Sequence, residues 1–270
     1  MSNNKKHESD RKISKLTLGF WYYFSKPLLI FKILMNRNMS VSTKILGRNI
    51  HFNNINCFRI IEKGIKEIDI KRDYIYKNTD CFVDVGAHIG TKTIMFHEVN
   101  PEVECLMFEP ISTTCDFLRE NTKHISKSHI FETAISESEK KVPIFFDEDH
   151  LNVSSLNKDH YFLNKNAKKP IKKQEITSKP LDSFFDLIKE KNKIYLKIDV
   201  EANEKEVLRG AQKFLSKVKY LEIEVIQDKI NPLSETLKLI NRKFNIIEID
   251  CLKGEDVYSP KAVNFLIELY

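Results

Sequence analysis

The stretch Phe82-Val83-Asp84-Val85-Gly86-Ala87-His88-Ile89-Gly90 decides the fold of this sequence. Together with Cys81 it begins as a near-continuous apolar run, which is typical of a β-strand covered on both faces of a parallel sheet. An acid followed by G-x-x-x-G then leads into a helix-period segment, Ile89–Val99, which Asn100-Pro101 ends. Glycine in such a turn lets a ligand approach the backbone, and the following helix N-terminus favours negative charge. The stretch therefore predicts a strand, a ligand-binding turn and a helix.

Outward from this stretch, short apolar runs alternate with helix-period segments. Further strands are predicted over residues 104–108, 129–132, 193–200, 218–226, 244–250 and 263–269, and further helices from Ser112, from Leu181, over 204–215 and around Pro232. This alternation predicts an α/β fold with a mostly parallel sheet and crossover helices. About a dozen residues without helical periodicity join the last two strands, so this pair is expected to be antiparallel. Ser112 is expected to cap its helix.

Residues 136–180 interrupt this rhythm. They are rich in Lys, Asn, Asp and Ser, and they contain one strand-like run, Val142–Phe146, and one basic stretch, Lys165–Lys173. We interpret the segment as an insertion or flap, and the basic stretch as a solvated face.

Composition limits the class of protein. The 270 residues are 41% hydrophobic, which is enough for one large core. With 7 Gly and 8 Pro, the chain is neither collagen-like nor of low complexity. Its five cysteines form no C-x-x-C pair, which argues against a zinc site or a disulfide framework and favours a reducing, cytoplasmic compartment.

Charge is distributed unevenly along the chain. Residues 1–50 carry ten Lys or Arg against Glu8 and Asp10, so +8; the net charge of +6 then leaves −2 for the other 220 residues. A polyanion-binding field over the whole protein is therefore not supported, and no nucleic-acid partner is expected. We predict a basic, aromatic, helical extension over residues 1–50 and a main domain over residues 51–270.

Residues 16–35 form an apolar segment that contains the only tryptophan, Trp21. Lys26, Pro27 and Lys32 lie inside the segment and argue against a membrane-spanning helix. No small-residue cleavage site follows, so a secretory signal peptide is also disfavoured. Three interpretations stay open: a helix pair packed on the domain, a peripheral anchor on the inner face of an anionic membrane, or a contact with a partner protein.

An acid at the end of the second predicted strand, Glu109, follows Asp84 by 25 residues. In nucleoside-binding sheets an acid at that position accepts the hydrogens of the two ribose hydroxyls. A dinucleotide fold would need G-x-G-x-x-G, whereas here only Gly86 and Gly90 are present and Asp84 would repel a phosphate. The combination favours S-adenosylmethionine, whose cationic tail tolerates carboxylates and whose tail carboxylate can use the loop amides. The candidate cofactor-binding residues are Asp84, Gly86, His88, Gly90, Glu109 and Ala134.

A second group of charges lies on the strand 193–200. Alternation places Lys197, Asp199 and Glu201 on one side, at the carboxyl end where ligands of open parallel sheets bind. Buried charges need partners, so a structural Lys197–Asp199 pair is one interpretation. The other is catalytic, with Asp199 or Glu201 as the base and Lys197 tuning them.

Two further acids, Glu222 and Glu224, alternate on the next predicted strand and add carboxylates near the same edge. A divalent metal held by Asp199, Glu201 and Glu224 is conceivable because hard cations take oxygen ligands, but no metal is expected.

The chain resembles the FkbM family of S-adenosylmethionine-dependent methyltransferases from about Phe82 to Val225. The blocks that carry the resemblance are residues 82–90, Phe108-Glu109-Pro110, Leu181-Asp182, Leu196-Lys197-Ile198-Asp199-Val200-Glu201, Glu206-Val207-Leu208-Arg209-Gly210-Ala211 and Glu222-Ile223-Glu224-Val225. One block departs: the family usually reads D-V-E-G-A-E, whereas this chain has Ala202 at the glycine position.

The resemblance implies a Rossmann-like class I methyltransferase with a seven-stranded sheet and an antiparallel last strand. It also implies methylation of a hydroxyl, often on a sugar of a glycan, a lipid or a natural product. The alternative is a catalytically inactive, membrane-associated binding protein on the same fold. An RNA methyltransferase is disfavoured by the −2 charge of the main domain and by the lack of an N-P-P-Y tetrad.

Overall fold

The computed structural model describes residues 41–45, 48–52, 70–147, 154–158, 170–226, 233–251 and 262–270. The chain divides into two compact units, Met1–Ile60 and Ile61–Tyr270. In the first unit, β1 (Val41–Ile45) and β2 (Arg48–Phe52) form an antiparallel hairpin. No helix among the described residues is long and apolar enough to cross a membrane.

The predicted helical extension over residues 1–50 is wrong where the structure describes it. Residues 41–45 and 48–50 are strand, and the sequence Val41-Ser42-Thr43-Lys44-Ile45 is rich in β-branched residues, which favour extended backbone. Residues 1–40, including the aromatic segment 16–35, lie outside the described residues.

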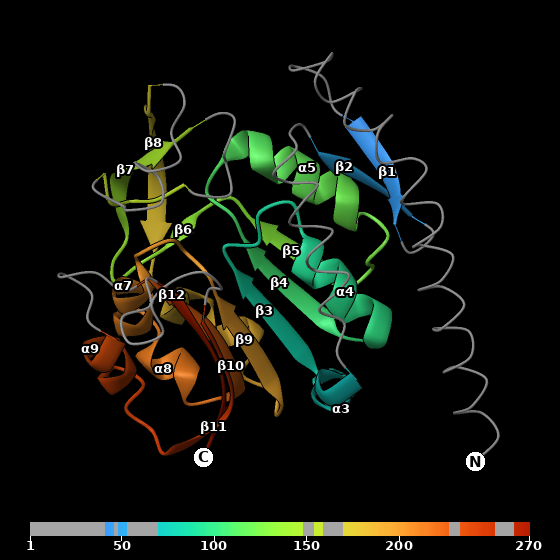
Figure 1. Cartoon of the computed structure of the whole chain (residues 1–270), viewed down its shortest axis with the longest axis vertical. Helices are drawn as coiled ribbons and strands as arrows, with labels where there is room; N and C mark the ends of the chain where they lie inside the picture. Colours follow the sequence, from blue (N-terminus) through green and yellow to red (C-terminus); the bar gives the residue numbers. More distant parts are fainter. Residues whose placement is uncertain are drawn as a thin grey trace. The chain divides into compact units, whose positions relative to one another are not determined.

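The second unit contains a seven-stranded sheet with the order β11-β12-β10-β9-β3-β4-β5 (Figure 1). Its strands are β3 (Cys81–Val85), β4 (Glu104–Phe108), β5 (Ser128–Phe131), β9 (Ile194–Ile198), β10 (Val218–Ile226), β11 (Phe244–Cys251) and β12 (Ala262–Leu269). The sheet is parallel except for β12, which lies between β10 and β11 and is antiparallel to both. This confirms the predicted α/β class, the mostly parallel sheet and the antiparallel last strand.

Each face of this sheet is covered by helices and buries its own core (Figure 1). One face carries α3 (Ile70–Lys77), α4 (Thr91–Val99) and α5 (Ser112–Thr122), and the other carries η2 (Leu181–Leu187), α7 (Glu204–Arg209), α8 (Gln212–Leu215) and α9 (Leu233–Lys238). On the first face Phe82 stacks on Phe96 with ring centroids 4.3 Å apart, and Tyr195 meets Phe96 edge-on at 5.2 Å. Apolar residues on alternate sides of the strands therefore explain why the central strands are buried on both faces.

Two helix predictions need correction. The helix expected over 204–215 is divided into α7 and α8 at Gly210, where a Cβ atom would overlap the carbonyl oxygen of Ser136. Ser112 is the first residue of α5, and the cap position is held by Ile111 without a side-chain hydrogen bond. Pro232 lies outside the described residues.

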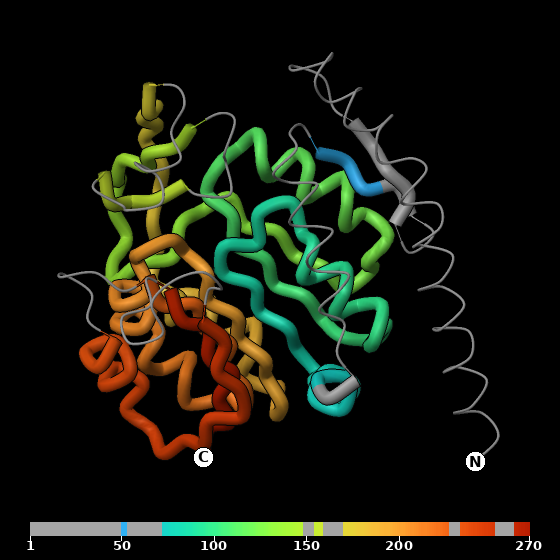
Figure 2. Tube along the Cα trace, viewed as in Figure 1, coloured from blue at the N-terminus to red at the C-terminus, as the bar shows by residue number. Residues whose placement is uncertain are grey.

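The predicted insertion is largely a second, three-stranded sheet with the order β6-β8-β7. It consists of β6 (Ala134–Ile135), β7 (Lys140–Phe146) and β8 (Lys172–Lys179), and the chain enters it after β5 and leaves it at η2 (Figure 2). Its inner face buries Ile144 and Ile176, and Ser155 extends it through a bridge to Phe145. The described part of the basic stretch, at Lys172 and Lys173, is exposed.

Candidate active site

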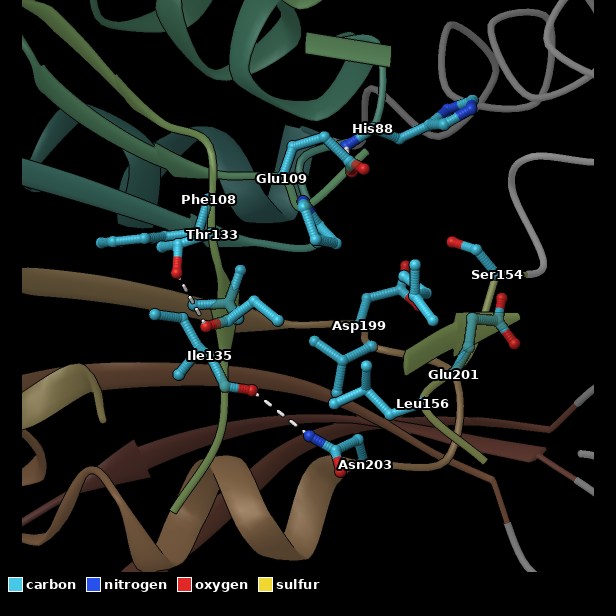
Figure 3. Close-up of a pocket in the computed structure, with 16 residues that line it drawn as sticks. His88, Phe108, Glu109, Thr133, Ile135, Ser154, Leu156, Asp199, Glu201 and Asn203 are labelled. Carbon is cyan, nitrogen blue, oxygen red and sulfur yellow. Dashed lines mark hydrogen bonds between the residues drawn. The ribbon is translucent and has the colours of Figure 1, made fainter. Parts of the chain in front are cut away.

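A pocket opens where the carboxyl ends of β3, β4 and β9 meet the small sheet (Figure 3). Its walls come from Val85, Gly86 and His88 after β3, Phe108 to Pro110 after β4, Thr133 to Ile135, Ile144, Ser154 and Leu156 of the small sheet, and Asp199, Val200, Glu201 and Asn203 after β9. This is the sheet edge at which open parallel sheets bind ligands.

Glu109 is held in this pocket by two backbone donors. Its Oε2 accepts from the N–H of His88 at 3.0 Å, and its Oε1 accepts from the N–H of Ile111 at 3.0 Å. Each carboxylate oxygen keeps a second lone pair, so the group can still accept two hydroxyl hydrogens, as a ribose diol requires. Burial raises the pKa of Glu109 to about 7, although both backbone donors act against this shift.

The turn after β3 uses its own amides within the protein. Four of them donate to protein acceptors: those of Gly86, Ala87, His88 and Gly90. The expectation that a cofactor carboxylate uses these loop amides is therefore wrong for these four positions. Figure 3 shows the His88 ring turned away from Asp199 and Glu201, and burial lowers the pKa of His88 to about 4, so the ring is neutral.

Both glycines of the turn have left-handed backbone, with φ of 82° at Gly86 and 85° at Gly90. A Cβ at Gly86 would overlap the backbone carbonyl oxygen of Asp199, whereas a Cβ at Gly90 would lie 2.8 Å from Leu118 and 2.9 Å from Thr122 side-chain atoms. Gly86 is therefore required by the contact between the β3 turn and the Asp199 backbone, and Gly90 is favoured by its packing against side chains of α5.

Asp84 and Lys197 lie behind the pocket, opposite each other in register on β3 and β9. Asp84 is fully buried, with Oδ2 accepting from the hydroxyl of Thr93 at 2.8 Å and Oδ1 3.4 Å from Lys197 Nζ. Lys197 Nζ also lies 3.2 Å from Asp199 Oδ2. The predicted Lys197–Asp199 pair is therefore present. Lys197 also pairs with the buried Asp84, and so connects Asp84 to the pocket.

Asp199 lines the pocket with 34% of its side chain exposed. Burial would raise its pKa, but the charge of Lys197 and a hydrogen bond from Glu224 outweigh this and lower it. For Lys197, burial acts to lower the pKa, and the charges of Asp199 and Asp84 raise it overall. Asp199 is therefore ionised at neutral pH and can accept a hydrogen bond or a proton from a ligand hydroxyl.

Glu201 and Glu224 complete a group of carboxylates around Asp199, with one oxygen of each residue within 4.8 Å of the others. Burial, followed by the charge of Asp199, raises the pKa of both glutamates well above the ordinary value. Glu224 also accepts from the side-chain amide of Asn264 at 3.2 Å. Three carboxylates at this spacing could hold a divalent cation, because hard cations take oxygen ligands.

The fourth predicted acid, Glu222, belongs to a different network. Its carboxylate accepts from Arg72 at 3.0 Å, from Lys92 at 2.9 Å and from the hydroxyl of Tyr195 at 2.7 Å. Burial raises its pKa, but Lys92 and Arg72 prevail and lower it to about 2. Glu222 therefore connects α3 and α4 to the sheet and does not line the pocket.

Of the predicted site residues, six line the pocket: Gly86, His88, Glu109, Ala134, Asp199 and Glu201. Asp84, Gly90 and Lys197 do not line it. Sequence reasoning missed Ser154, Leu156 and Ile144 because they belong to the segment that we interpreted as an insertion, where no motif marks them. Other omissions were recoverable, since they lie in or beside the motif blocks quoted above: Val85, Phe108, Pro110, Val200 and Asn203.

Comparison with known proteins gives a family and distant structural neighbours. The methyltransferase FkbM domain family matches residues 84–247. A search of curated proteins found no match.

Among solved structures, the Methanococcus jannaschii fibrillarin pre-rRNA processing protein is 12% identical, with 86% of this chain and 83% of that chain covered and a TM-score of 0.45. A putative rRNA methylase from Clostridium thermocellum is 9% identical, with 74% of this chain and 95% of that chain covered and a TM-score of 0.41. M. jannaschii TYW2 in complex with AdoMet is 13% identical, with 85% of this chain and 84% of that chain covered and a TM-score of 0.41. At identities and TM-scores this low, the substrates of those proteins cannot be transferred to this chain.

The family match begins at Asp84 and includes Glu109, Asp199, Glu201 and the strand β10. It therefore includes every residue that lines the pocket, and it covers more than half of the sequence. The chain belongs to the FkbM methyltransferase family and is an S-adenosylmethionine-dependent methyltransferase.

Proposed function

We propose that this methyltransferase transfers the methyl group to a hydroxyl, on a sugar of a glycan, a glycolipid or a natural product. The observation that carries the proposal is that two different carboxylates line one pocket: Glu109, held by backbone N–H groups, and Asp199, held by Lys197. The first suits a ribose diol, and the second suits a hydroxyl that must lose its proton.

The chemistry is divided between cofactor and protein. When bound, S-adenosylmethionine supplies the electrophilic methyl carbon. Glu109 would orient the cofactor through its ribose, and Asp199 would accept the proton of the acceptor hydroxyl as the new O–C bond forms. Lys197 does not line the pocket, so its proposed role is to hold Asp199 in place and ionised.

The charge of the pocket supports a neutral acceptor over a nucleic acid. Its acidic lining residues are Glu109, Asp199 and Glu201, and no Lys or Arg of the described residues lines it. A polyanion gains affinity from Lys and Arg at its phosphates, which this lining does not offer. We therefore propose a neutral, hydroxyl-rich acceptor.

The test is methyl transfer from isotopically labelled S-adenosylmethionine to glycan and glycolipid extracts, read by mass spectrometry. Surface glycans from cells with and without the gene provide the comparison. We expect a mass increase of one methyl group on a hexose or deoxyhexose. The inactive-protein alternative predicts cofactor binding with no transfer to any extract, and transfer to RNA alone would contradict the proposed acceptor class.

A metal-assisted version of the same site is favoured by one observation, the grouping of Asp199, Glu201 and Glu224. In that version a divalent cation would lower the pKa of the bound hydroxyl, and the three carboxylates would be its ligands. Loss of transfer after treatment with EDTA, restored by magnesium or manganese, would support it. Full activity in EDTA supports Asp199 as the base without metal.

We also propose a peripheral membrane contact through residues 16–35, supported by the sequence alone: +8 over residues 1–50 and Trp21 within the apolar segment. Each Lys or Arg near an anionic surface contributes about 1 kcal/mol to binding. Full-length protein should co-sediment with phosphatidylserine vesicles, and Trp21→Ser together with Lys26→Ser should weaken this. Equal binding to neutral vesicles, or none to anionic ones, contradicts the contact.

A further inference from the structure

The turn after β9 holds two consecutive non-glycine residues in left-handed backbone. Glu201 has φ of 54° and Ala202 has φ of 72°. This region is costly for residues with a Cβ, so the turn persists only if neighbouring groups hold it. Because Glu201 lines the pocket, what holds this turn also decides where the Glu201 carboxylate lies.

Two hydrogen bonds hold the turn from opposite sides. The Ala202 N–H donates to Glu204 Oε1 at 2.9 Å, within the same loop. The Glu201 carbonyl oxygen accepts from the hydroxyl of Ser155, which comes from a part of the chain 46 residues earlier. Ser155 is 1% exposed, so this hydrogen bond is shielded from water.

Ser155 is itself fixed to the small sheet. Its N–H donates to the Phe145 carbonyl at 2.9 Å, its carbonyl accepts from the Phe145 N–H at 2.8 Å, and its hydroxyl oxygen accepts from the Asn157 N–H at 3.1 Å. Its neighbours Ser154 and Leu156 both line the pocket. The segment therefore presents alternate residues to the pocket and the intervening serine to the β9 turn, as Figure 3 shows for Ser154 and Leu156 beside Asp199 and Glu201.

We propose that Ser155 is a positioning residue, whose hydroxyl holds the Glu201–Ala202 turn in its left-handed conformation. It thereby couples the orientation of Glu201 to the segment Ser154–Leu156, which forms part of the pocket wall. An acceptor that contacts Ser154 or Leu156 would then also set the geometry at Glu201. The catalytic consequence rests on the proposed function in a version in which Glu201 takes part in transfer, as a metal ligand or as the base, whereas the coupling of Ser155 to the turn does not.

The first experiment measures hydrogen exchange of the full-length protein at the amides of residues 200–203, with Ala202 N–H as the main reporter. Loss of one hydrogen bond in Ser155→Ala should speed exchange there about fivefold. Ser154→Ala is the matched control and should leave these amides unchanged. If Ser155→Ala does not fold, Ser155→Cys keeps the size and weakens the donor, and it should give the same change.

Ala202→Gly provides an independent check, because glycine adopts positive φ without steric cost. It should slow exchange at the same amides, and the double variant with Ser155→Ala should return toward the wild-type rate. Faster exchange confined to β7 in Ser155→Ala would overturn the proposal, since Ser155 would then stabilise only the small sheet.

The second experiment concerns catalysis and uses the acceptor identified by the transfer assay. Ser155→Ala should lower kcat while the Kd for S-adenosylmethionine stays within about twofold, as expected for a residue that acts through Glu201. In a Glu201→Gln background the same substitution should have no further effect on kcat. An undiminished effect in that background would show that Ser155 does not act through Glu201, even where the exchange result holds.

Discussion

Gly86 lies directly against the backbone of Asp199, so closely that a Cβ on this glycine would overlap the Asp199 carbonyl oxygen. The contact joins the turn after β3 to the residue that we place nearest the acceptor. The Asp199 N–H donates to the Val85 carbonyl at 3.0 Å, which continues the parallel pairing of β3 and β9 to this point. The turn after β3 and the proposed base, Asp199, are therefore fixed to each other through backbone contacts.

Gly86→Ala should consequently impair both functions at once. The new Cβ meets backbone atoms, which cannot rotate away, and φ of 82° is itself strained for alanine. We expect a lower melting temperature and loss of S-adenosylmethionine binding by calorimetry. Gly90→Ala is the matched control: its φ is 85°, but its Cβ would meet side-chain atoms of Leu118 and Thr122, which can shift. Equal losses in the two variants would show that backbone strain alone explains the effect.

Glu109 should control cofactor affinity in a pH-dependent manner. Glu109→Gln removes the charge that accepts the ribose hydroxyls, which should weaken binding by about 1.5–3 kcal/mol. Because burial raises the pKa of Glu109 to about 7, the wild-type carboxylate becomes protonated as pH falls through 7. Wild-type affinity should therefore decrease below pH 7, with proton release on binding, and the Gln variant should lack both effects.

Calorimetry at pH 6 and pH 8, in two buffers of different ionisation enthalpy, measures affinity and proton release together. Glu132→Gln is a suitable control, because Glu132 pairs with Arg119 and does not line the pocket. A wild-type affinity that is independent of pH over this range would show that Glu109 is not the ribose acceptor.

The sequence was sufficient for most of the large sheet because its strands carry continuous apolar runs. β3, β4 and β10 begin and end at the predicted residues: β3 and β4 are buried on both faces, and β10 alternates buried apolar residues with half-buried ones. The small sheet was harder to predict. Its strands β7 and β8 are rich in lysine and bury few residues, so their pairing depends on a few buried side chains such as Ile144 and Ile176.

The site could be predicted where charge interrupts an apolar strand. Asp84, Lys197 and Asp199 stand out because each is an ionisable group in a buried run. Alternation alone could not separate Glu222 from Glu224. Partners from α3 and α4, Arg72 and Lys92, bind the first, and such partners are set by tertiary packing.

Asp199→Asn should separate chemistry from binding. The substitution keeps the shape of the side chain but removes the proton acceptor, and Lys197 keeps Asp84 as its partner. We expect transfer to the acceptor to fall at least about a hundredfold, as is typical for loss of a general base. Affinity for S-adenosylmethionine should stay within a few-fold of wild type. Near-normal transfer by this variant would exclude Asp199 as the base and leave Glu201 as the candidate.

Glu222 should contribute to stability and not to methyl transfer itself, because it joins α3 and α4 to β10 without lining the pocket. Glu222→Gln leaves the largely buried cations Lys92 and Arg72 with less compensation, which should lower the free energy of unfolding by about 3 kcal/mol. Urea unfolding at pH 7 measures this loss. The exposed pair Glu206–Arg209 supplies the control, and Glu206→Gln should change stability by less than about 0.5 kcal/mol.

The contribution of Glu222 to stability should depend on pH. Lys92 and Arg72 lower the pKa of Glu222 to about 2, against the effect of burial, so the folded state holds the ionised form more tightly than the unfolded state does. Its contribution is therefore complete above the ordinary glutamate pKa and is lost as pH falls toward 2. The stability difference between wild type and Glu222→Gln should shrink when unfolding is repeated at pH 4 and pH 3. A difference that stays constant across this range would mean that packing, and not the charge of Glu222, holds α3 and α4 to the sheet.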